Sequence, residues 1–348
     1  MRLFSEAFHR IKQNFADEVD DKKLIESCVA GMVSGIDPDS AYLDKSKFNS
    51  LKAGSQKTIG GIGVNLSIKN SFPIVISAIE DTPSYFSGIK SGDVILQINE
   101  NNMQGVRLDD VVSQIRGYPG ESVRLTIARE GNNKPIVFDI ERKQIRIRSV
   151  KYKILENNIG YIRITTFSGN TGKAFKKSLN KLVSQSKNKL NGLVIDLRNN
   201  PGGLLDQAIV VADTFLSDGL IAYAESKNSG SDLKFTAKKA VMLEGTPLVI
   251  LVNKGSAAAS EIVSAALRDH NRATIIGEKT FGRASIQMLM PLLNGGALKL
   301  TTSRWRTPNG DYIHGRGIEP DIVVSNSSTL RDDIQLKKAV NVIKGIKN

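Results

Sequence analysis

The sequence predicts an α/β (α+β) multidomain protein: a core with a mixed β-sheet and helices, a smaller β-rich domain inserted ahead of it, and a helical N-terminal arm. Three observations support this prediction. Residues 1–50 carry helical periodicity, residues 57–143 carry short β-type runs between turns, and the chain from residue 150 onwards alternates strand-like and helix-like segments. With 348 residues, the chain is long enough for two or three domains.

The N-terminal arm, residues 1–50, is expected to contain two amphipathic helices. Leu3 and Phe4 begin the apolar face of the first helix, and the second helix runs from Lys22–Val33 and stops at Gly35. Short helices ahead of a folded domain often pack on that domain or pair with another copy of the chain. The arm therefore predicts a homodimer or a higher homo-oligomer.

The inserted domain, residues 57–143, is expected to be mostly β. Its strand-like runs are residues 64–68, 74–79, 94–98, 123–128 and 136–140, and its short helical stretches are residues 84–87 and 108–115. A glycine loop, Gly60–Val64, comes just before the first run, and the motif Ser91–Asn99 follows later. This order of motifs resembles a PDZ domain in the permuted strand order found in bacterial proteases.

The PDZ resemblance implies a peptide-binding site at the glycine loop. Its members would be Gly61, Ile62, Gly63 and Val64, whose backbone N–H groups would bind the terminal carboxylate of a peptide. The strand that follows would pair with the peptide by β-augmentation. An ordinary glycine turn between two strands is the alternative.

The core, residues 150–325, has α/β patterning, and residues 326–348 are expected to form a helical C-terminal tail. Leu193–Leu197 and Leu248–Val252 are continuous apolar runs typical of buried strands, and each leads into a glycine-bearing loop and then a helix-like segment. Because sites in α/β proteins usually lie at strand ends, we expect these two loops to carry the chemistry.

Composition excludes several classes of function. The formal net charge is +13, but the basic residues are scattered and only 6% of residues are aromatic, so a nucleic-acid partner is not expected. A single cysteine and three distant histidines predict no metal site, and we expect no cofactor. No apolar stretch is long enough for a transmembrane segment, and the N-terminus lacks the apolar core of a signal peptide.

Three sequence blocks carry the most specific signal. The first is Val194–Gly203, which runs from a strand into a Pro-Gly-Gly turn. The second has two parts, Asn253–Ile262 and Gly277–Gln287. The third is the closing block Gly317–Ile322. Together these blocks resemble the C-terminal processing peptidases, also called tail-specific proteases. The resemblance covers nearly the whole chain, and the blocks agree in order and spacing.

The resemblance implies an oxyanion hole built from backbone amides. A helix that starts after a small-residue loop presents N–H groups to a developing negative charge, and glycine lets a backbone approach the substrate closely. In the family, the Gly-Gly turn and the residue after the nucleophile supply these donors. The matching positions are Gly202, Gly203 and Ala259. An ordinary strand–loop–helix crossover is the alternative.

The catalytic positions depart from the family pattern. The family's serine nucleophile corresponds to Ala258, and its lysine base, 25 residues later, corresponds to Arg283. Gln287 matches the glutamine that orients the lysine in many members. A methyl group cannot attack a carbonyl, and an arginine side chain cannot be deprotonated to act as a base. The chain as written is therefore predicted to be catalytically inactive, whether the substitutions are natural or deliberate.

Neighbouring residues offer weak substitutes for the missing pair. Ser260 lies two positions beyond Ala258, where the helical repeat turns its side chain about 200° away, so a capping or packing role is expected. Ser285 with Lys279 is not supported by spacing. His270 follows Asp269, but adjacent helical residues face different directions, which argues against a triad with a serine.

Three functions were weighed, from different classes. The first is a PDZ-containing serine endopeptidase of the Ser-Lys type that captures protein C-terminal tails and cleaves them, here carrying inactivating substitutions. The second is a pseudo-protease that binds peptide tails as a scaffold, and the third is a nucleic-acid-binding module, which the motifs disfavour. The resemblance further implies an adaptor protein as a partner and a location in the periplasm or cell envelope. Without a signal peptide, either the N-terminus has been trimmed or the chain stays in the cytoplasm.

Overall fold

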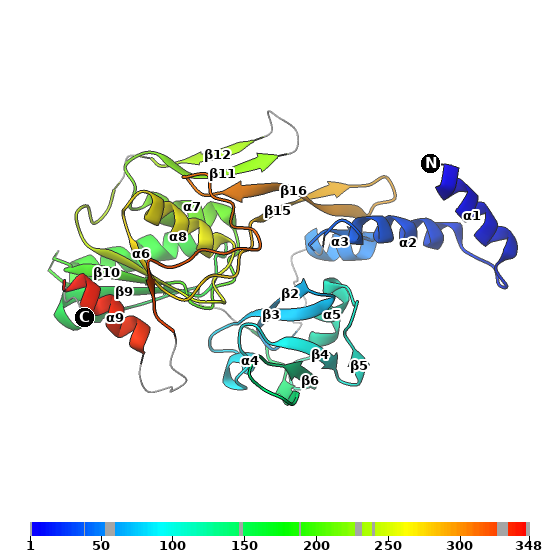
Figure 1. The fold of residues 1–348 in the computed structure, drawn as a ribbon, viewed down its shortest axis with the longest axis horizontal. Helices are drawn as coiled ribbons and strands as arrows, with labels where there is room; N and C mark the ends of the chain where they lie inside the picture. Colours follow the sequence, from blue (N-terminus) through cyan, green and yellow to red (C-terminus); the bar gives the residue numbers. More distant parts are fainter. Residues whose placement is uncertain are drawn as a thin grey trace. The chain divides into compact units, whose positions relative to one another are not determined.

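The computed structural model of the protein divides into two compact units. The described stretches are residues 2–37, 39–52, 60–145, 149–187, 189–226, 232–238, 241–325 and 333–345. One unit combines Met1–Gln56 with Gln287–Thr301, and the other combines Lys57–Ile286 with Thr302–Asn348. Figure 1 follows the chain through these elements in sequence order.

The first unit contains the N-terminal helices and part of a β-hairpin. Its elements are α1 (Arg2–Asn14), α2 (Asp21–Ser34), β1 (Ala41–Leu43), α3 (Lys45–Lys52) and portions of β15 (Ser285–Pro291) and β16 (Ala297–Arg306). Asp20 caps α2 by accepting a hydrogen bond from the Lys22 amide at 2.9 Å. The β1 strand pairs antiparallel with β16, with Ala41 opposite Lys299. Helices thus form where the amphipathic pattern predicts them, and β1 is an additional strand within residues 1–50.

The second unit begins with a β-rich domain whose sheet has the order β2-β3-β4-β6-β7, with β5 beside β4. Its elements are β2 (Val64–Lys69), β3 (Phe72–Ala78), α4 (Pro83–Phe86), β4 (Val94–Ile98), β5 (Asn101–Asn102), α5 (Leu108–Ile115), β6 (Ser122–Ala128) and β7 (Ile136–Glu141). In β6, Val123, Leu125 and Ile127 point alternately inward and are fully buried, as a strand with one covered face requires. The five predicted strand-like runs and both short helices are present, although residues 57–59 lie outside the described residues.

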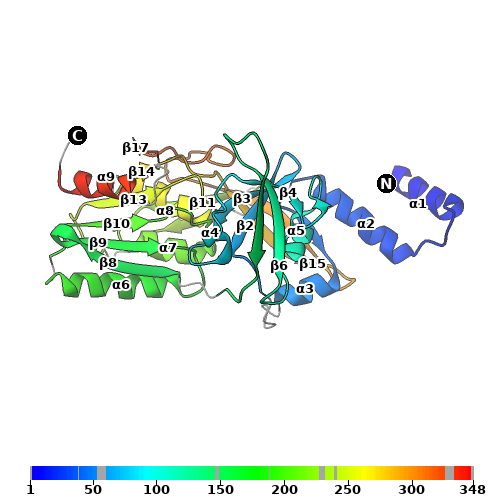
Figure 2. The ribbon, with the colours of Figure 1, turned by 90° about the horizontal axis from the view of Figure 1, so that it is seen from below.

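The peptidase-like core is built on a six-stranded sheet of order β17-β14-β13-β10-β9-β8. Its strands are β8 (Val150–Leu155), β9 (Ile159–Ile164), β10 (Gly192–Asp196), β13 (Leu248–Val252), β14 (Thr274–Gly277) and β17 (Ile322–Val323). All neighbours are parallel except the antiparallel pair β8 and β9. Figure 2 shows β8, β9, β10 and β13 side by side.

Helices cover both faces of this sheet. The helices are α6 (Thr171–Gln185), α7 (Leu205–Asp213), α8 (Ala259–Asp269) and α9 (Ile334–Ile343), and a short 3₁₀ turn, Glu156–Asn158, precedes β9. Ile195 and Ile250 pack in the same apolar cluster as α6, α7 and α8, whereas Val194 and Val249 pack with Ala339 of α9. Every residue of β10 and β13 is buried, which explains why both read as continuous apolar runs.

Two further strands extend the second unit. They are β11 (Leu220–Ser226) and β12 (Leu233–Thr236), and β11 pairs antiparallel with the end of β16, with Tyr223 opposite Arg306. Within the predicted C-terminal tail, α9 is helical, whereas residues 326–332 and 346–348 lie outside the described residues. None of the described helices is long and apolar enough to cross a bilayer.

Candidate active site

The loops after β10 and β13 emerge at the same edge of the sheet. These strands are parallel neighbours, with Asp196 opposite Leu251, so the segments that follow them start side by side. The first is the turn Arg198–Gly203 and the second is the loop Asn253–Ala257 ahead of α8. The structure therefore brings together the two blocks that the sequence analysis expected to carry chemistry.

Ala258 occupies the N-cap position of α8 in an unusual backbone conformation. Its φ is 49° and its ψ is −112°, a combination that non-glycine residues rarely adopt. Its backbone amide donates to the Glu261 carboxylate at 2.8 Å. A strained turn between a buried strand and a helix is the geometry with which hydrolases expose a nucleophile. Here that turn carries a methyl group.

Gly202 packs directly against this turn. A Cβ added at Gly202 would lie 2.8 Å from the Ala258 Cβ and 2.9 Å from the Ala259 nitrogen, and its φ of 99° also favours glycine. Any larger residue would push the two loops apart. Glycine at this position therefore allows the two blocks to touch.

The amides of the Gly-Gly turn differ in their use. The Gly202 amide donates to the Asn200 side chain at 2.9 Å. Gly203 pairs with Phe167 in a parallel bridge, in which Phe167 donates to the Gly202 carbonyl and accepts from Leu204. Because these bonds flank Gly203, its own amide points away from Phe167. Gly202 is buried and Gly203 is exposed.

The backbone N–H of Ala259 is another hydrogen-bond donor near Ala258. Ala259 is the first residue of α8, and the first N–H groups of a helix have no acceptor within the helix. The helix dipole adds a partial positive charge at the same end. The start of α8 therefore presents a backbone N–H group directly after Ala258, and Gly202 lies against both residues.

A loop that carries Arg283 is tied to the Ala258 turn by one buried carboxylate. The fully buried Glu261 accepts hydrogen bonds from the Gly282 amide at 2.7 Å and the Arg283 amide at 2.9 Å, besides that of Ala258. Burial raises the pKa of the Glu261 carboxyl, and these donors oppose that rise. Arg283 itself is half-buried, and Gln287 lies four residues further on, half-buried in β15.

The neighbouring hydroxyl and imidazole groups have structural partners. The buried Ser256 donates to the Leu197 carbonyl at 2.8 Å, and the buried Ser260 donates to the Asn200 carbonyl at 2.9 Å. The His270 Nε2 lies 2.7 Å from the Leu220 carbonyl, to which it can only donate. The capping or packing role expected for Ser260 agrees with these contacts. Lys279 pairs with Glu319 at the surface instead of approaching a serine.

Asparagine side chains, which the sequence analysis did not single out, fasten the two turns to each other. Asn253 accepts from the Asn199 amide at 2.8 Å and donates to the Asn199 side chain at 2.9 Å. Asn200 is fully buried, and its carbonyl accepts from the Ala257 amide at 3.0 Å. The sequence signal that could have identified these residues is that asparagines follow both buried apolar runs.

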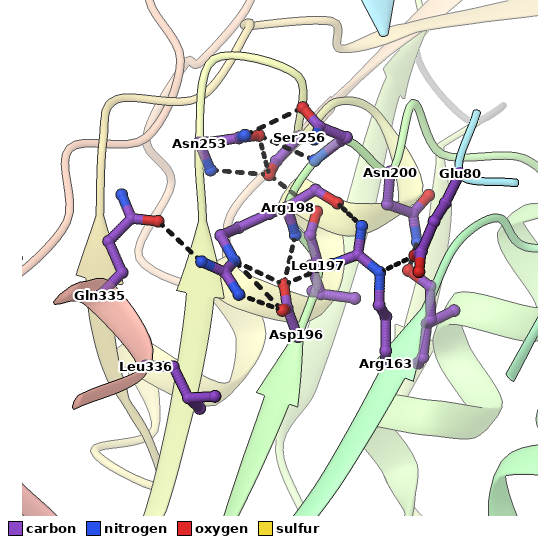
Figure 3. Close-up of polar contacts among 12 residues, drawn as sticks. Glu80, Arg163, Asp196, Leu197, Arg198, Asn200, Asn253, Ser256, Gln335 and Leu336 are labelled. Atoms are coloured by element: carbon purple, nitrogen blue, oxygen red, sulfur yellow. Dashed lines mark hydrogen bonds and ion pairs between the residues drawn. The ribbon is translucent and has the colours of Figure 1, made fainter. Parts of the chain in front are cut away.

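A network of charged side chains lies at the carboxyl ends of β9 and β10 (Figure 3). Asp196 is fully buried and pairs with Arg163 at 3.0 Å and with Arg198 at 2.6 Å. Arg163 also pairs with Glu80 of the inserted domain, and Arg198 pairs with Asp333 at 2.8 Å. Although burial alone would raise the pKa of the Asp196 carboxyl, the two guanidinium groups hold it well below its usual range. An aspartate at the end of an apolar run was the sequence signal for this network.

The glycine loop of the inserted domain is partly engaged with its own domain. The Gly60 amide donates to the Gly117 carbonyl at 2.8 Å, and the Gly61 amide donates to the Lys143 carbonyl at 3.0 Å. Ile62 is fully buried, and the Gly63 carbonyl accepts from Ser84 at 2.7 Å. The loop is therefore anchored at its start, and Val64 follows it as the first residue of β2.

Comparison with known proteins agrees with this architecture. Residues 158–324 match Peptidase family S41, residues 52–128 match the PDZ domain, and residues 1–47 match the activating protease CtpB N-terminal domain. A carboxy-terminal-processing protease of Bartonella bacilliformis is 41% identical over 322 residues, which cover 92% of this chain and 74% of that protein. The carboxy-terminal processing protease CtpB of Bacillus subtilis is 33% identical and matches 98% of this chain and 72% of its own length.

A solved structure supports the same assignment. The photosystem II D1 C-terminal processing protease superposes with a TM-score of 0.81 at 25% identity, over 93% of this chain and 92% of that one. This protein and the two bacterial relatives are all named as C-terminal processing proteases. The chain therefore belongs to the carboxy-terminal processing protease family, as a PDZ-containing member of peptidase family S41.

Proposed function

We propose that this chain recognises the C-terminal tails of proteins or peptides and, as it stands, does not hydrolyse them. The observation that carries the proposal is Ala258, whose methyl group stands on the strained turn at the start of α8. Covalent catalysis needs an attacking oxygen or sulfur there. Arg283 at the base position stays charged, so it cannot take the proton that a Ser-Lys mechanism would transfer.

The surroundings of Ala258 support a lineage that once cut peptides. Gly203 and Ala259 are our proposed oxyanion donors, because one amide faces outward and the other opens α8. The Gly202 amide already donates to Asn200, so we assign Gly202 a packing role. Gln287 is proposed to orient the side chain at position 283. This scaffold can hold a substrate carbonyl although the attacking group is missing.

The experiment restores the missing pair. The double variant Ala258→Ser with Arg283→Lys should cleave a denatured protein with an apolar C-terminal tail, whereas the chain as written should show no turnover. Ser260→Ala serves as the control in both backgrounds, because Ser260 donates to a backbone carbonyl and is not aimed at a substrate. Hydrolysis by the chain as written that Ser260→Ala or Ser285→Ala abolishes would overturn the proposal.

The second part of the proposal is tail capture by the PDZ domain. We place the peptide at the segment Gly61, Ile62, Gly63 and Val64, beside β2, with its carboxylate on the amides that follow Gly61, because the Gly61 amide already donates to the Lys143 carbonyl. The anchored start of this loop, through Gly60 and Gly61, would keep the remaining amides in place. A tail peptide should bind more tightly than the same peptide with an amidated C-terminus. Equal dissociation constants for the two peptides would rule out carboxylate capture.

Further proposals follow from the family assignment. We infer a homodimer or a higher homo-oligomer, because Leu3, Phe4 and Ile11 of α1 are exposed apolar side chains. Sedimentation of the chain and of the variant Phe4→Glu with Ile11→Glu measures this association directly. A location in the periplasm or cell envelope and an adaptor protein are likewise proposed. Fractionation of cells that produce the full-length protein, followed by crosslinking, tests both.

A further inference from the structure

We propose that Glu261 is a positioning residue that holds the turn carrying position 258 and the loop carrying position 283 in register. The inference rests on the proposed function only in taking these two positions as those of nucleophile and base. Glu261 lies in the first turn of α8, three residues after Ala258, and its side chain is fully buried.

The carboxylate divides its two oxygens between the segments of the site. Glu261 Oε2 accepts from the Ala258 amide at 2.8 Å and from the Arg283 amide at 2.9 Å, so a single atom joins the two positions. Oε1 accepts from the Gly282 amide at 2.7 Å and from the Thr280 hydroxyl. A Glu at this helical position normally returns to the N-cap amide alone. Here it reaches a second loop as well.

Thr280 extends the arrangement to the third sequence block. Its hydroxyl donates to Glu261 and accepts from the Ile318 amide at 2.7 Å, and its own amide donates to the Ile318 carbonyl at 3.1 Å. Gly317 is needed beside it, since a Cβ there would lie 2.2 Å from the Thr280 carbonyl oxygen. The block around Gly317 and Ile318 thus acts on the site through Thr280 and Glu261.

All four hydrogen-bond partners of Glu261 are donors. The site therefore requires a side chain that only accepts hydrogen bonds, which a carboxylate does. The amide nitrogen of a glutamine would bring N–H groups against two of these donors, and the hydrogen bonds on that side would be lost. The methyl side chain of Ala258 cannot accept a hydrogen bond from the amides in the first turn of α8, as a capping serine or aspartate would. Its unfavourable backbone conformation therefore depends on Glu261 and on the packing of Gly202.

Amide hydrogen exchange, measured by NMR on the full chain, tests the role without any need for activity. In Glu261→Gln we expect the amides that face the new side-chain N–H groups, either Ala258 and Arg283 or Gly282, to exchange at least about 10-fold faster than in the parent chain, the effect of roughly one lost hydrogen bond. Ser264→Ala is the matched control, because it removes another buried hydrogen bond of α8, to the Ser260 carbonyl at 2.9 Å. It should leave those three amides protected. Unchanged exchange at all three in Glu261→Gln would overturn the proposal.

A kinetic arm separates positioning from folding. In the active background Ala258→Ser with Arg283→Lys, Glu261→Gln should lower kcat by about 100-fold, as small misplacements of reacting groups do, with KM within about 2-fold. Ser264→Ala should leave both unchanged. An unchanged kcat would also overturn the proposal. If the background itself is inactive, the proposed function fails, while the exchange measurement still tests Glu261.

A milder variant keeps the test available if Glu261→Gln does not fold. Thr280→Val removes one donor to Glu261 and the acceptor of the Ile318 amide. We expect faster exchange at Ile318, whose acceptor is lost, with Ala258 and Gly282 protected by their remaining bonds to Glu261. Parent-like exchange at Ile318, or loss of protection at Ala258, would contradict the arrangement.

Discussion

At the scale of single residues, Ala258 holds a backbone conformation that its methyl side chain does not favour. Ala258 has φ 49° and ψ −112°, although alanine gains nothing from this conformation. Backbone strain of this kind costs on the order of 1–3 kcal/mol and persists only where surrounding contacts impose it. The contacts here are the Glu261 carboxylate and Gly202.

This strain leads to a prediction for Ala258→Gly. Glycine adopts positive φ without steric cost, so the variant should raise the free energy of unfolding by about 1 kcal/mol, after the entropy cost of glycine is subtracted. Ala266→Gly, in the middle of α8, is the control and should lower it by about 1 kcal/mol. Urea unfolding followed by circular dichroism measures both. A loss of stability in Ala258→Gly as large as that in the control would show that the turn is not strained.

The sequence singled out positions 258 and 283 as candidates, but it did not indicate the backbone conformation or the contacts of these residues. Motif spacing was enough to find Ala258 and Arg283, because spacing is a property of the chain. Which glycine amide faces outward depends on the bridge between Phe167 and Gly203, a contact between segments that no local pattern reveals. The same reason explains why Glu261 was not seen as the link between the two loops.

At the scale of elements, a fully buried carboxylate orders the strand ends beneath the site. Asp196 at the end of β10 holds Arg163 and Arg198, which in turn reach Glu80 after β3 and Asp333 before α9. Removing one partner from a buried ion pair leaves the other charge without compensation, at a cost of about 3–5 kcal/mol. Asp196→Asn should therefore lower the free energy of unfolding by that amount, as measured by urea denaturation. A loss below about 1 kcal/mol would contradict the role given to Asp196.

The outer partner of this network predicts a pH-dependent effect. Although burial raises it, the hydrogen bond and charge of Arg198 bring the pKa of Asp333 below its ordinary value of 3.8. A carboxyl with a lowered folded-state pKa stabilises the fold above that ordinary value, and the contribution is lost as the pH falls through the folded-state pKa.

Asp333→Asn should therefore destabilise the chain by about 1 kcal/mol near neutral pH, the size expected for a partly exposed pair. The difference from the parent should disappear in the acid range below the folded-state pKa. Urea unfolding across this pH range measures it, and Glu130→Gln, at an exposed turn after β6, should have little effect at any pH. A loss for Asp333→Asn that stays constant with pH would contradict the assignment.

The hydrophobic pattern predicted strands correctly where every residue of the strand is buried. β10 and β13 are buried on both faces, so both appear in the sequence as continuous apolar runs. The short strands β1, β5 and β17 were not predicted, since two or three residues carry no periodicity and their pairing comes from distant partners. β16, which spans Ala297–Arg306, was not predicted either, and its two ends pair with β1 and β11, which lie far from it in the sequence.

At the scale of the whole molecule, the chain combines segments that match the CtpB N-terminal domain, the PDZ domain and peptidase family S41. The net charge of +13 is not accompanied by any sequence motif for nucleic-acid binding. Our functional proposal rests instead on a few residues around Ala258 and Arg283. Our proposal takes positions 258 and 283 as those of nucleophile and base, and the loops that carry them keep their contacts through Glu261.

The most direct test is a single-turnover assay with the chain in excess over a substrate that carries an apolar C-terminal tail. Mass spectrometry follows the substrate over hours for the chain as written and for the Ala258→Ser, Arg283→Lys double variant. Our account predicts intact substrate with the chain as written and cleaved substrate with the double variant. Cleavage products from the chain as written, or intact substrate with a folded double variant, would contradict it.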